Sequence, residues 1–173
     1  MSLNVEADVS LQPFNTFGVA TRARYLAHAH DDAEVGEALQ AAKRLQLPLL
    51  VIGGGSNLFL TGDVEALVLR MASRGLRIVS SQGDAVLVEA EAGEPWHPFV
   101  QWTLEQGLQG LENLSLIPGT VGAAPMQNVG AYGVEIKDVF AGLTALDRHT
   151  GELREFTLDE CEFAYRDSRF KRE

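Results

Sequence analysis

Cysteine is almost absent from this sequence, which is 173 residues long and contains one, Cys161. A single cysteine excludes an internal disulfide, and this usage fits a reducing compartment. Acidic residues on both sides of Cys161 disfavour the thiolate that a nucleophile requires. We therefore expect Cys161 to have a structural role.

Basic residues and long apolar runs are also scarce. Lys and Arg number 14 against 24 Asp and Glu, which gives a formal net charge of −10. Nucleic-acid affinity depends on cations that neutralise phosphates, so this balance argues against a nucleic-acid partner. No stretch approaches the ~18 apolar residues of a membrane span, and the N-terminus lacks the features of a signal peptide. The sequence predicts a cytoplasmic protein with no membrane partner.

The hydrophobic pattern predicts mixed α and β structure with short connections. Asp31 and Glu34 resemble a capping box, and apolar residues recur at helical spacing until Pro48. The run that follows, Leu49–Ile52, is typical of a strand buried on both faces. We also expect strands at Ala66–Met71, Leu76–Ser80 and Ala85–Glu91, a hairpin from Leu143 to Phe156, and a helix that Pro95 opens and Gly107 follows, with Phe99, Val100, Thr103 and Leu104 on its inner side.

Glycine is concentrated in two loops that together suggest a pyrophosphate cradle. Gly53–Asn57 reads GGGSN, and Ile117–Gly133 reads IPGTVGAAPMQNVGAYG. A glycine run can turn its amides toward one point and let an anion approach the backbone. The second loop also offers polar groups to a long, flat ligand, and Tyr132 either stacks on a ring or fills the core. A dinucleotide-like cofactor is the leading hypothesis, and two glycine-rich tight turns are the alternative.

Three common glycine motifs do not fit these loops. GGGSN lacks the third glycine and the following helix of a dinucleotide-binding Rossmann fingerprint. Neither loop contains the Lys-Ser or Lys-Thr pair of a P-loop. Ser56 lacks the glycine two residues later that a GxSxG elbow requires. These differences argue against a GTPase, a kinase and a serine hydrolase.

Four ordered motifs resemble those of UDP-N-acetylenolpyruvoylglucosamine reductases: NTFG at Asn15–Gly18, VIGGGSN at Val51–Asn57, LSLIPGTVGAAPMQNVGAYG at Leu114–Gly133 and YRDSRFK at Tyr165–Lys171. The resemblance extends over almost the whole chain. It implies an α+β FAD-binding fold of the vanillyl-alcohol-oxidase type, made of two packed α/β subdomains, which we place at residues 1–72 and 73–173. It also implies NADPH-dependent conversion of UDP-N-acetylglucosamine enolpyruvate to UDP-N-acetylmuramate for the bacterial cell wall.

The resemblance also implies roles for single residues. The family's GGGSN loop binds the FAD pyrophosphate, which assigns that role to Gly53, Gly54, Gly55, Ser56 and Asn57. Further cofactor contacts are implied for Ile117, Pro118, Gly119, Thr120, Gly122 and Ala123, and a place near the flavin or in its supporting shell for Asn128, Gly130, Tyr132 and Gly133.

Histidine and cysteine give no reason to expect covalent flavin or a metal. None of these residues lies in either glycine loop; they are His28, His30, His97, His149 and Cys161. We therefore expect FAD to bind noncovalently. His28 and His30 have no third ligand at a recognisable spacing, so we expect surface histidines and no metal.

By the same resemblance, Arg166 is the active-site arginine and Tyr165 its neighbour at the substrate. Hydride transfer to the enolpyruvyl group develops negative charge, and an arginine stays charged and holds a carboxylate bidentately. On charge alone, the basic run Arg166, Arg169, Lys171 and Arg172 favours a solvated tail. The motif match reverses that preference for Arg166 but not for Arg172.

The chain departs from the family in its length. The reductases continue into a substrate-binding domain that carries a serine acid and a late glutamate, whereas this sequence stops at Glu173. We expect the cofactor-binding half of the enzyme, unable to complete turnover alone, and a monomer in the complete enzyme. The contrasting hypothesis is a noncatalytic sugar-nucleotide-binding or interaction module without a redox role.

Overall fold

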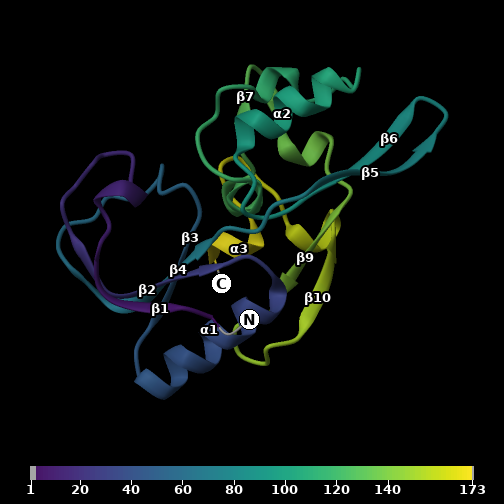
Figure 1. Cartoon of the computed structure of the whole chain (residues 1–173). Coiled ribbons are helices and arrows are strands. Elements are labelled where there is room, and N and C mark those ends of the chain that lie inside the picture. Colours follow the sequence, from purple (N-terminus) through teal and green to yellow (C-terminus); the bar gives the residue numbers. More distant parts are fainter. Residues whose placement is uncertain (1–2, 173) are drawn as a thin grey trace. The chain divides into compact units, whose positions relative to one another are not determined.

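A computed structural model describes residues 3–172, and Figure 1 shows its helices and strands. The chain divides into two compact units: unit 1 comprises Met1–Ser73 and Leu146–Glu152, and unit 2 comprises Arg74–Ala145 and Leu153–Glu173. Residues 146–152, which the expected boundary assigned to the second subdomain, belong to unit 1. Each unit has its own buried apolar clusters.

Unit 1 contains a four-stranded sheet in the order β1-β2-β4-β3. The strands are β1 (Val5–Ser10), β2 (Arg22–Ala29), β3 (Leu49–Ile52) and β4 (Val64–Met71). β2, β3 and β4 are parallel, and β1 pairs antiparallel with β2. The prediction that 49–52 is a strand is confirmed, but the prediction of burial on both faces is wrong. β3 lies at the edge of this sheet, and Val51 is 54% exposed. The prediction failed because an apolar run does not reveal strand order.

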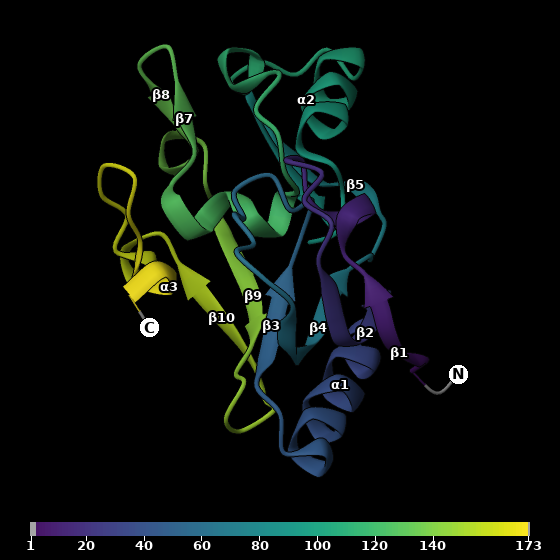
Figure 2. The same ribbon diagram turned by 90° about the vertical axis from the view of Figure 1, so that its left-hand side faces the viewer.

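Helix α1 (Asp32–Leu45) covers one face of this sheet, as Figure 2 shows. Its predicted start is confirmed, since an Asp31 carboxylate oxygen accepts the Glu34 amide hydrogen at 2.8 Å. The Glu34 carboxylate accepts from the His30 amide, so the reciprocal contact is made one residue earlier than in a capping box. Small side chains let helix and sheet approach closely: Ala38, Ala41 and Ala42 pack with Ala27, Ala29, Leu67 and Leu69.

The other face of the sheet supports the segment that follows β3. Leu26, Ile52 and Val68 are buried on this face. Phe14, from the short helix η1 (Gln12–Phe14), and Leu58 pack against them. These contacts fold the GGGSN loop, which lies between Ile52 and Leu58, over the sheet.

The remaining predicted elements lie in unit 2, except that residues 146–152, the last residue of one strand and the turn of the second hairpin, belong to unit 1. The hairpin of β5 (Leu76–Gln82) and β6 (Ala85–Ala90) and that of β9 (Gly142–Leu146) and β10 (Leu153–Thr157) are confirmed. Helix α2 (Trp96–Glu105) is confirmed too, although Pro95 is its N-cap rather than a residue of its first turn. The expected inner position of Leu104 is wrong, because its side chain is 43% exposed and Trp96 is buried instead.

Short elements complete the chain and were not expected from its periodicity. They are η2 (Glu112–Leu114), η3 (Val121–Gln127), β7 (Gly130–Ala131), β8 (Val134–Glu135), η4 (Ile136–Asp138), η5 (Asp159–Cys161) and α3 (Arg169–Arg172). The core of unit 2 joins α2 to this region, through Trp96, Phe99, Val100, Leu114, Ala124, Val129 and Ile136. Within residues 3–172, no helix is long and apolar enough to cross a membrane.

The helix cap gives a first test of the fold. Asp31→Ala removes the acceptor for the Glu34 amide and is expected to lower the free energy of unfolding by about 1 kcal/mol, measured by urea denaturation. Asp31→Asn keeps an acceptor at the cap and is the matched control. An Asp31→Ala protein as stable as Asp31→Asn would show that this cap does not stabilise α1.

Candidate functional site

The GGGSN loop is seated on the segment that contains the NTFG motif. Gly55 has φ +66°, and a Cβ atom at this position would lie 1.9 Å from the carbonyl oxygen of Phe14. The Gly55 carbonyl in turn accepts the amide hydrogen of Thr16 at 3.3 Å. No side chain fits in this space, so glycine is required at residue 55 by packing as well as by its backbone angle.

Asn15 fixes residues 11–19, the segment against which Gly55 packs and which we call the seat of the loop. It is 7% exposed, and its amide nitrogen donates to the carbonyl oxygens of Leu11 and Val19 at 2.8 and 3.1 Å. Its amide oxygen accepts the Val19 amide hydrogen at 3.0 Å. These bonds close the segment beneath Gly55 into one shape. Sequence reasoning quoted Asn15 only as part of a motif and missed this role, although asparagine is typical of such local loop contacts.

The same loop presents backbone donors. None of the hydrogen bonds within residues 3–172 uses the backbone N–H of Gly54 or Ser56. Gly54 is exposed, and Ser56 is half-buried. Unused amides on a glycine turn are the groups that bind phosphate oxygens. This part of the chain therefore fits a diphosphate.

An aromatic and cationic cluster lies beside this seat. The Phe14 ring contacts the His28 ring, with centroids 5.5 Å apart, and the Arg70 guanidinium lies 5.3 Å from the Phe14 centroid. Burial, and to a lesser extent Arg70, lowers the pKa of His28. His28 is therefore neutral at neutral pH and half-buried rather than a surface residue, whereas His30 is exposed.

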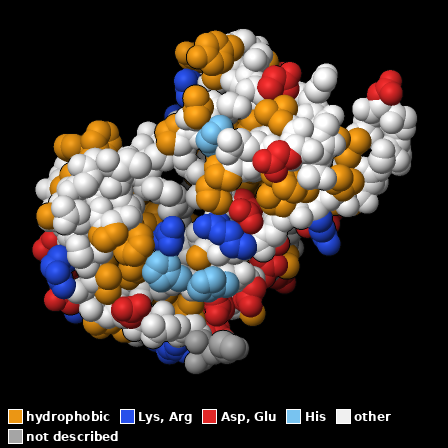
Figure 3. Space-filling view, turned by 45° about the horizontal axis from the view of Figure 1, so that its top comes forward, with side chains coloured by type: hydrophobic (Ala, Val, Ile, Leu, Met, Phe, Trp, Pro, Cys, Tyr) orange, Lys and Arg blue, Asp and Glu red, His pale blue; other side chains and the backbone are white. Residues whose placement is uncertain are grey.

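Charged side chains of both signs lie on the surface. On the face drawn in Figure 3, Lys and Arg side chains are interspersed with Asp and Glu side chains. Among residues 3–172, no three His, Cys, Asp or Glu side chains are grouped as metal ligands are.

The second glycine loop in unit 2 differs from the expected cradle. The amides of Val121 and Gly122 donate to the carbonyl oxygens of Glu94 and Ala92, both at 2.9 Å. A Cβ on Gly122 would lie 2.7 Å from the Cβ of Ala92. These two amides are used within the protein and are not available to an anion, whereas the expected cofactor contacts of the rest of the loop stay predictions. Pro118, Gly122 and Ala123 nevertheless keep an exposed side.

The end of this loop forms a hairpin between β7 and β8. Tyr132 and Gly133 have φ of 52° and 81°, the pattern of a two-residue type I′ turn. Gly130 has no space for a side chain, because a Cβ would lie 2.9 Å from Val134 and Glu135 atoms. Tyr132 is 88% exposed, so the alternative that it fills the core is wrong.

His97 supports the beginning of the loop. Its Nδ1 atom accepts the amide hydrogen of Leu116 at 3.2 Å, which requires that nitrogen to be unprotonated. Leu116 has φ 63° and is 77% exposed, and Ile117 and Pro118 follow it. Sequence reasoning considered His97 only as an attachment point for flavin and missed this contact. The sequence around His97 could not reveal this contact, because its partner lies 19 residues away.

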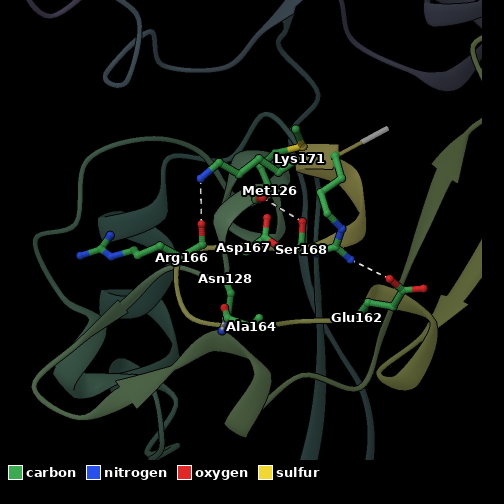
Figure 4. A network of polar contacts seen from close by, with 9 residues as sticks. Met126, Asn128, Glu162, Ala164, Arg166, Asp167, Ser168 and Lys171 are labelled. Atoms are coloured by element: carbon green, nitrogen blue, oxygen red, sulfur yellow. Dashed lines mark hydrogen bonds and ion pairs between the residues drawn. The ribbon is translucent and has the colours of Figure 1, made fainter.

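The YRDSRFK motif forms a tight turn that presents Arg166. Ala164 and Asp167 exchange two backbone hydrogen bonds of 3.0 and 3.1 Å around Tyr165 and Arg166. Arg166 has φ 52°, a conformation that costs a non-glycine residue roughly 1–2 kcal/mol. Tyr165 is 84% exposed. Figure 4 shows the Arg166 side chain pointing away from the polar network behind the turn.

The neighbouring basic residues have partners within unit 2. Arg172 pairs with Asp167 and Glu162, and the Lys171 ammonium donates to the Arg166 carbonyl at 2.8 Å. The Arg169 guanidinium lies 5.6 Å from the Phe156 ring centroid. Among residues 3–172, the Arg166 guanidinium forms no ion pair. The motif is therefore not a uniformly solvated tail.

Two buried side chains join the third and fourth motifs. The Asn128 amide donates to the Ala164 carbonyl at 3.0 Å and accepts from the Lys137 amide at 3.2 Å. The Ser168 hydroxyl donates to the Met126 carbonyl at 2.8 Å. Asn128 is 0% exposed, and both ends of its side-chain amide are bonded within unit 2.

The seat of Gly55 predicts a large cost of substitution. Gly55→Ala combines an unfavourable φ with overlap on the Phe14 carbonyl, whereas Gly83→Ala has a matching φ of +59° and open space. We expect Gly83→Ala to lower the free energy of unfolding by about 1 kcal/mol and Gly55→Ala by ~1–3 kcal/mol more. Equal values in urea denaturation would contradict the packing at Gly55.

Cys161 is predicted to be unreactive in the folded chain. It is 0% exposed, and burial raises the pKa of its thiol, so the thiolate fraction is below that of a free cysteine at the same pH. A disulfide reagent at pH 8 should modify it only after unfolding. Rapid modification of the native protein would overturn this structural role.

Comparisons with known proteins agree with the expected cofactor domain. A model of the FAD binding domain family matches residues 23–157. The structure is similar to UDP-N-acetylenolpyruvylglucosamine reductase from Thermus caldophilus, with TM-score 0.76 and 28% identity over 96% of this chain and 57% of that one. It also resembles 6-hydroxy-D-nicotine oxidase from Arthrobacter nicotinovorans, with TM-score 0.69 and 21% identity over 92% of this chain and 37% of that one. The α+β fold of the vanillyl-alcohol-oxidase type is thereby confirmed.

Curated relatives confirm the resemblance of the motifs. The chain is 74% identical over 171 residues to a UDP-N-acetylenolpyruvoylglucosamine reductase of Pseudomonas fluorescens strain Pf-5, covering 99% of this chain and 50% of that protein. It is 71% identical to the reductase of Pseudomonas aeruginosa strain PAO1, covering 100% of this chain and 51% of that protein. The chain thus spans about half the length of the curated relatives it matches. On the match over residues 23–157, the chain belongs to the FAD binding domain family.

Proposed function

We propose that this chain is the cofactor-binding part of an NADPH-dependent reductase that converts UDP-N-acetylglucosamine enolpyruvate to UDP-N-acetylmuramate in peptidoglycan synthesis. One observation carries the proposal: a glycine loop with unused amides lies on a buried seat, in a chain that matches the FAD binding domain family. The 74% identity to a reductase of Pseudomonas fluorescens supports the choice of reaction.

The cofactor contacts follow from the two loops. In the proposed site, Gly53–Asn57 binds the diphosphate of noncovalent FAD, with the Gly54 and Ser56 amides as donors. The second loop contributes contacts through groups other than the Val121 and Gly122 amides, from Ile117, Pro118, Gly119, Thr120, Gly122, Ala123, Gly130, Tyr132 and Gly133. When bound, FAD supplies hydride transfer between NADPH and the enolpyruvyl double bond.

Arg166 and Tyr165 complete the proposed reaction on the substrate side. The Arg166 guanidinium is exposed and has no ion pair within residues 3–172, so its donors are available to a carboxylate. Held beside the enolpyruvyl group, it stabilises the negative charge that develops there, and Tyr165 contacts the substrate next to it. A cytoplasmic location and a monomeric state in the complete enzyme stay predictions.

Titration with FAD tests the cofactor proposal. We expect saturable binding with a changed flavin absorbance spectrum, and at least about tenfold weaker binding for Gly54→Val, because a side chain blocks approach to the backbone. Gly62→Val is the control, because residue 62 has open space. Unchanged affinity in a folded Gly54→Val protein removes the loop from the site. Uridine-nucleotide binding without flavin binding would support the sugar-nucleotide module instead.

Kinetics test the role of Arg166. The reaction is measured in a reductase assembled from this chain and the part of the Pseudomonas fluorescens relative that the chain does not match. Arg166→Ala should lower kcat by roughly 10²–10³-fold, as loss of an oxyanion donor does, with little change in FAD affinity. Arg148→Ala, at an exposed turn, controls for the loss of a positive charge. A greater effect on FAD affinity than on kcat would mean that Arg166 is misassigned.

A further inference from the structure

The turn that presents Arg166 is held from both sides by side chains of one neighbouring loop and of its own motif. Asn128 bonds the carbonyl of Ala164, the residue before the turn, and Ser168, just after it, bonds the carbonyl of Met126. Asn128 and Ser168 are both 0% exposed. Figure 4 shows the Ser168 hydroxyl directed at Met126 and the Arg166 side chain extending away from both.

The turn needs such support because its own bonds are few. Two backbone hydrogen bonds close it, and its second central residue, Arg166, has an unfavourable φ of 52°. A strained conformation persists only where surrounding contacts determine it. The contact on Ala164 fixes one end of the turn, and the contact from Ser168 fixes the other.

The chemistry of Asn128 suits this position closely. Its φ of 46° is one that asparagine tolerates better than most residues. One end of its side chain donates to Ala164, and the other accepts from Lys137. The amide offers both a donor and an acceptor, whereas a carboxylate only accepts. Asn128, the C-cap of η3, therefore ties the turn to η4 as well as to η3.

We infer that Asn128 and Ser168 are positioning residues, which fix the turn at Tyr165 and Arg166 against the loop at Met126–Asn128 and so hold the guanidinium in the orientation that binds the substrate carboxylate. The inference rests on the proposed role of Arg166. Neither side chain touches the substrate or the cofactor, because both are fully buried. They act on the reaction through the backbone that carries Arg166.

We call the Asn128–Ala164 and Ser168–Met126 hydrogen bonds the clamp. Hydrogen exchange in the 173-residue chain tests the clamp without any enzymatic activity. Ser168→Ala removes one hydrogen bond and should speed exchange of the Ala164 and Asp167 amides about fivefold. Thr103→Val is the matched control, since the buried Thr103 hydroxyl donates to the Val100 carbonyl at 2.8 Å, away from the turn. Exchange at Ala164 and Asp167 that is unchanged, or raised equally by Thr103→Val, overturns the inference.

A double-mutant cycle tests the link to Arg166. In the assembled reductase, Ser168→Ala should lower kcat about tenfold through misplacement of the guanidinium, while FAD affinity stays the same. In an Arg166→Ala background, the same substitution should have no further effect on kcat, because the group that it positions is gone. If Ser168→Ala lowers kcat by a further tenfold in the Arg166→Ala background, Ser168 has only a structural role and the inference is contradicted.

A second variant addresses the other contact. Asn128→Asp keeps the acceptor for the Lys137 amide and loses the donor to Ala164, so it should reproduce both the faster exchange and the dependence on Arg166. Normal exchange at Ala164 in folded Asn128→Asp would remove Asn128 from the clamp. A wild-type assembled enzyme that binds FAD but has no reductase activity refutes the proposed function, and the exchange results then decide the clamp alone.

Discussion

The carbonyl oxygen of Phe14 occupies the space in which a side chain of residue 55 would lie. This contact fixes the GGGSN loop on its sheet, and Asn15 holds the opposing segment with three hydrogen bonds. Because the loop is seated in this way, its Gly54 and Ser56 amides stay free of partners within residues 3–172. A diphosphate then finds donors already in place, so little ordering entropy is lost on binding.

In unit 2, several non-glycine residues have a left-handed backbone conformation. Leu116, Asn128, Tyr132 and Arg166 all have positive φ, and each lies in one of the two later sequence motifs, LSLIPGTVGAAPMQNVGAYG or YRDSRFK. Strain of this kind costs about 1–3 kcal/mol per residue and gathers where function requires a fixed geometry. His97 supports Leu116, and the tight hairpin supports Tyr132. The exposed side chains of Leu116, Tyr132 and Tyr165 thus lie on backbone segments that hydrogen bonds hold in place.

The sequence predicted best what depends on local chemistry. Asp31 and the apolar spacing after it located α1, and the turn residues located the hairpins at 81–84 and 148–151. It predicted poorly what depends on distant neighbours. The edge position of β3, the exposure of Leu104 and the use of the Gly122 amide by Ala92 are set by tertiary contacts. Motif resemblance singled out Arg166 as a candidate, but its connection to Asn128 and Ser168 depends on tertiary contacts that the sequence does not reveal.

Amide NMR shifts during ligand titration report whether the backbone amides of the GGGSN loop bind a diphosphate. FAD and riboflavin share the flavin ring, but riboflavin has no phosphate. We expect FAD to shift the Gly54 and Ser56 amide resonances strongly and riboflavin to leave them unchanged. FAD binding that leaves both resonances in place would contradict this role of the loop.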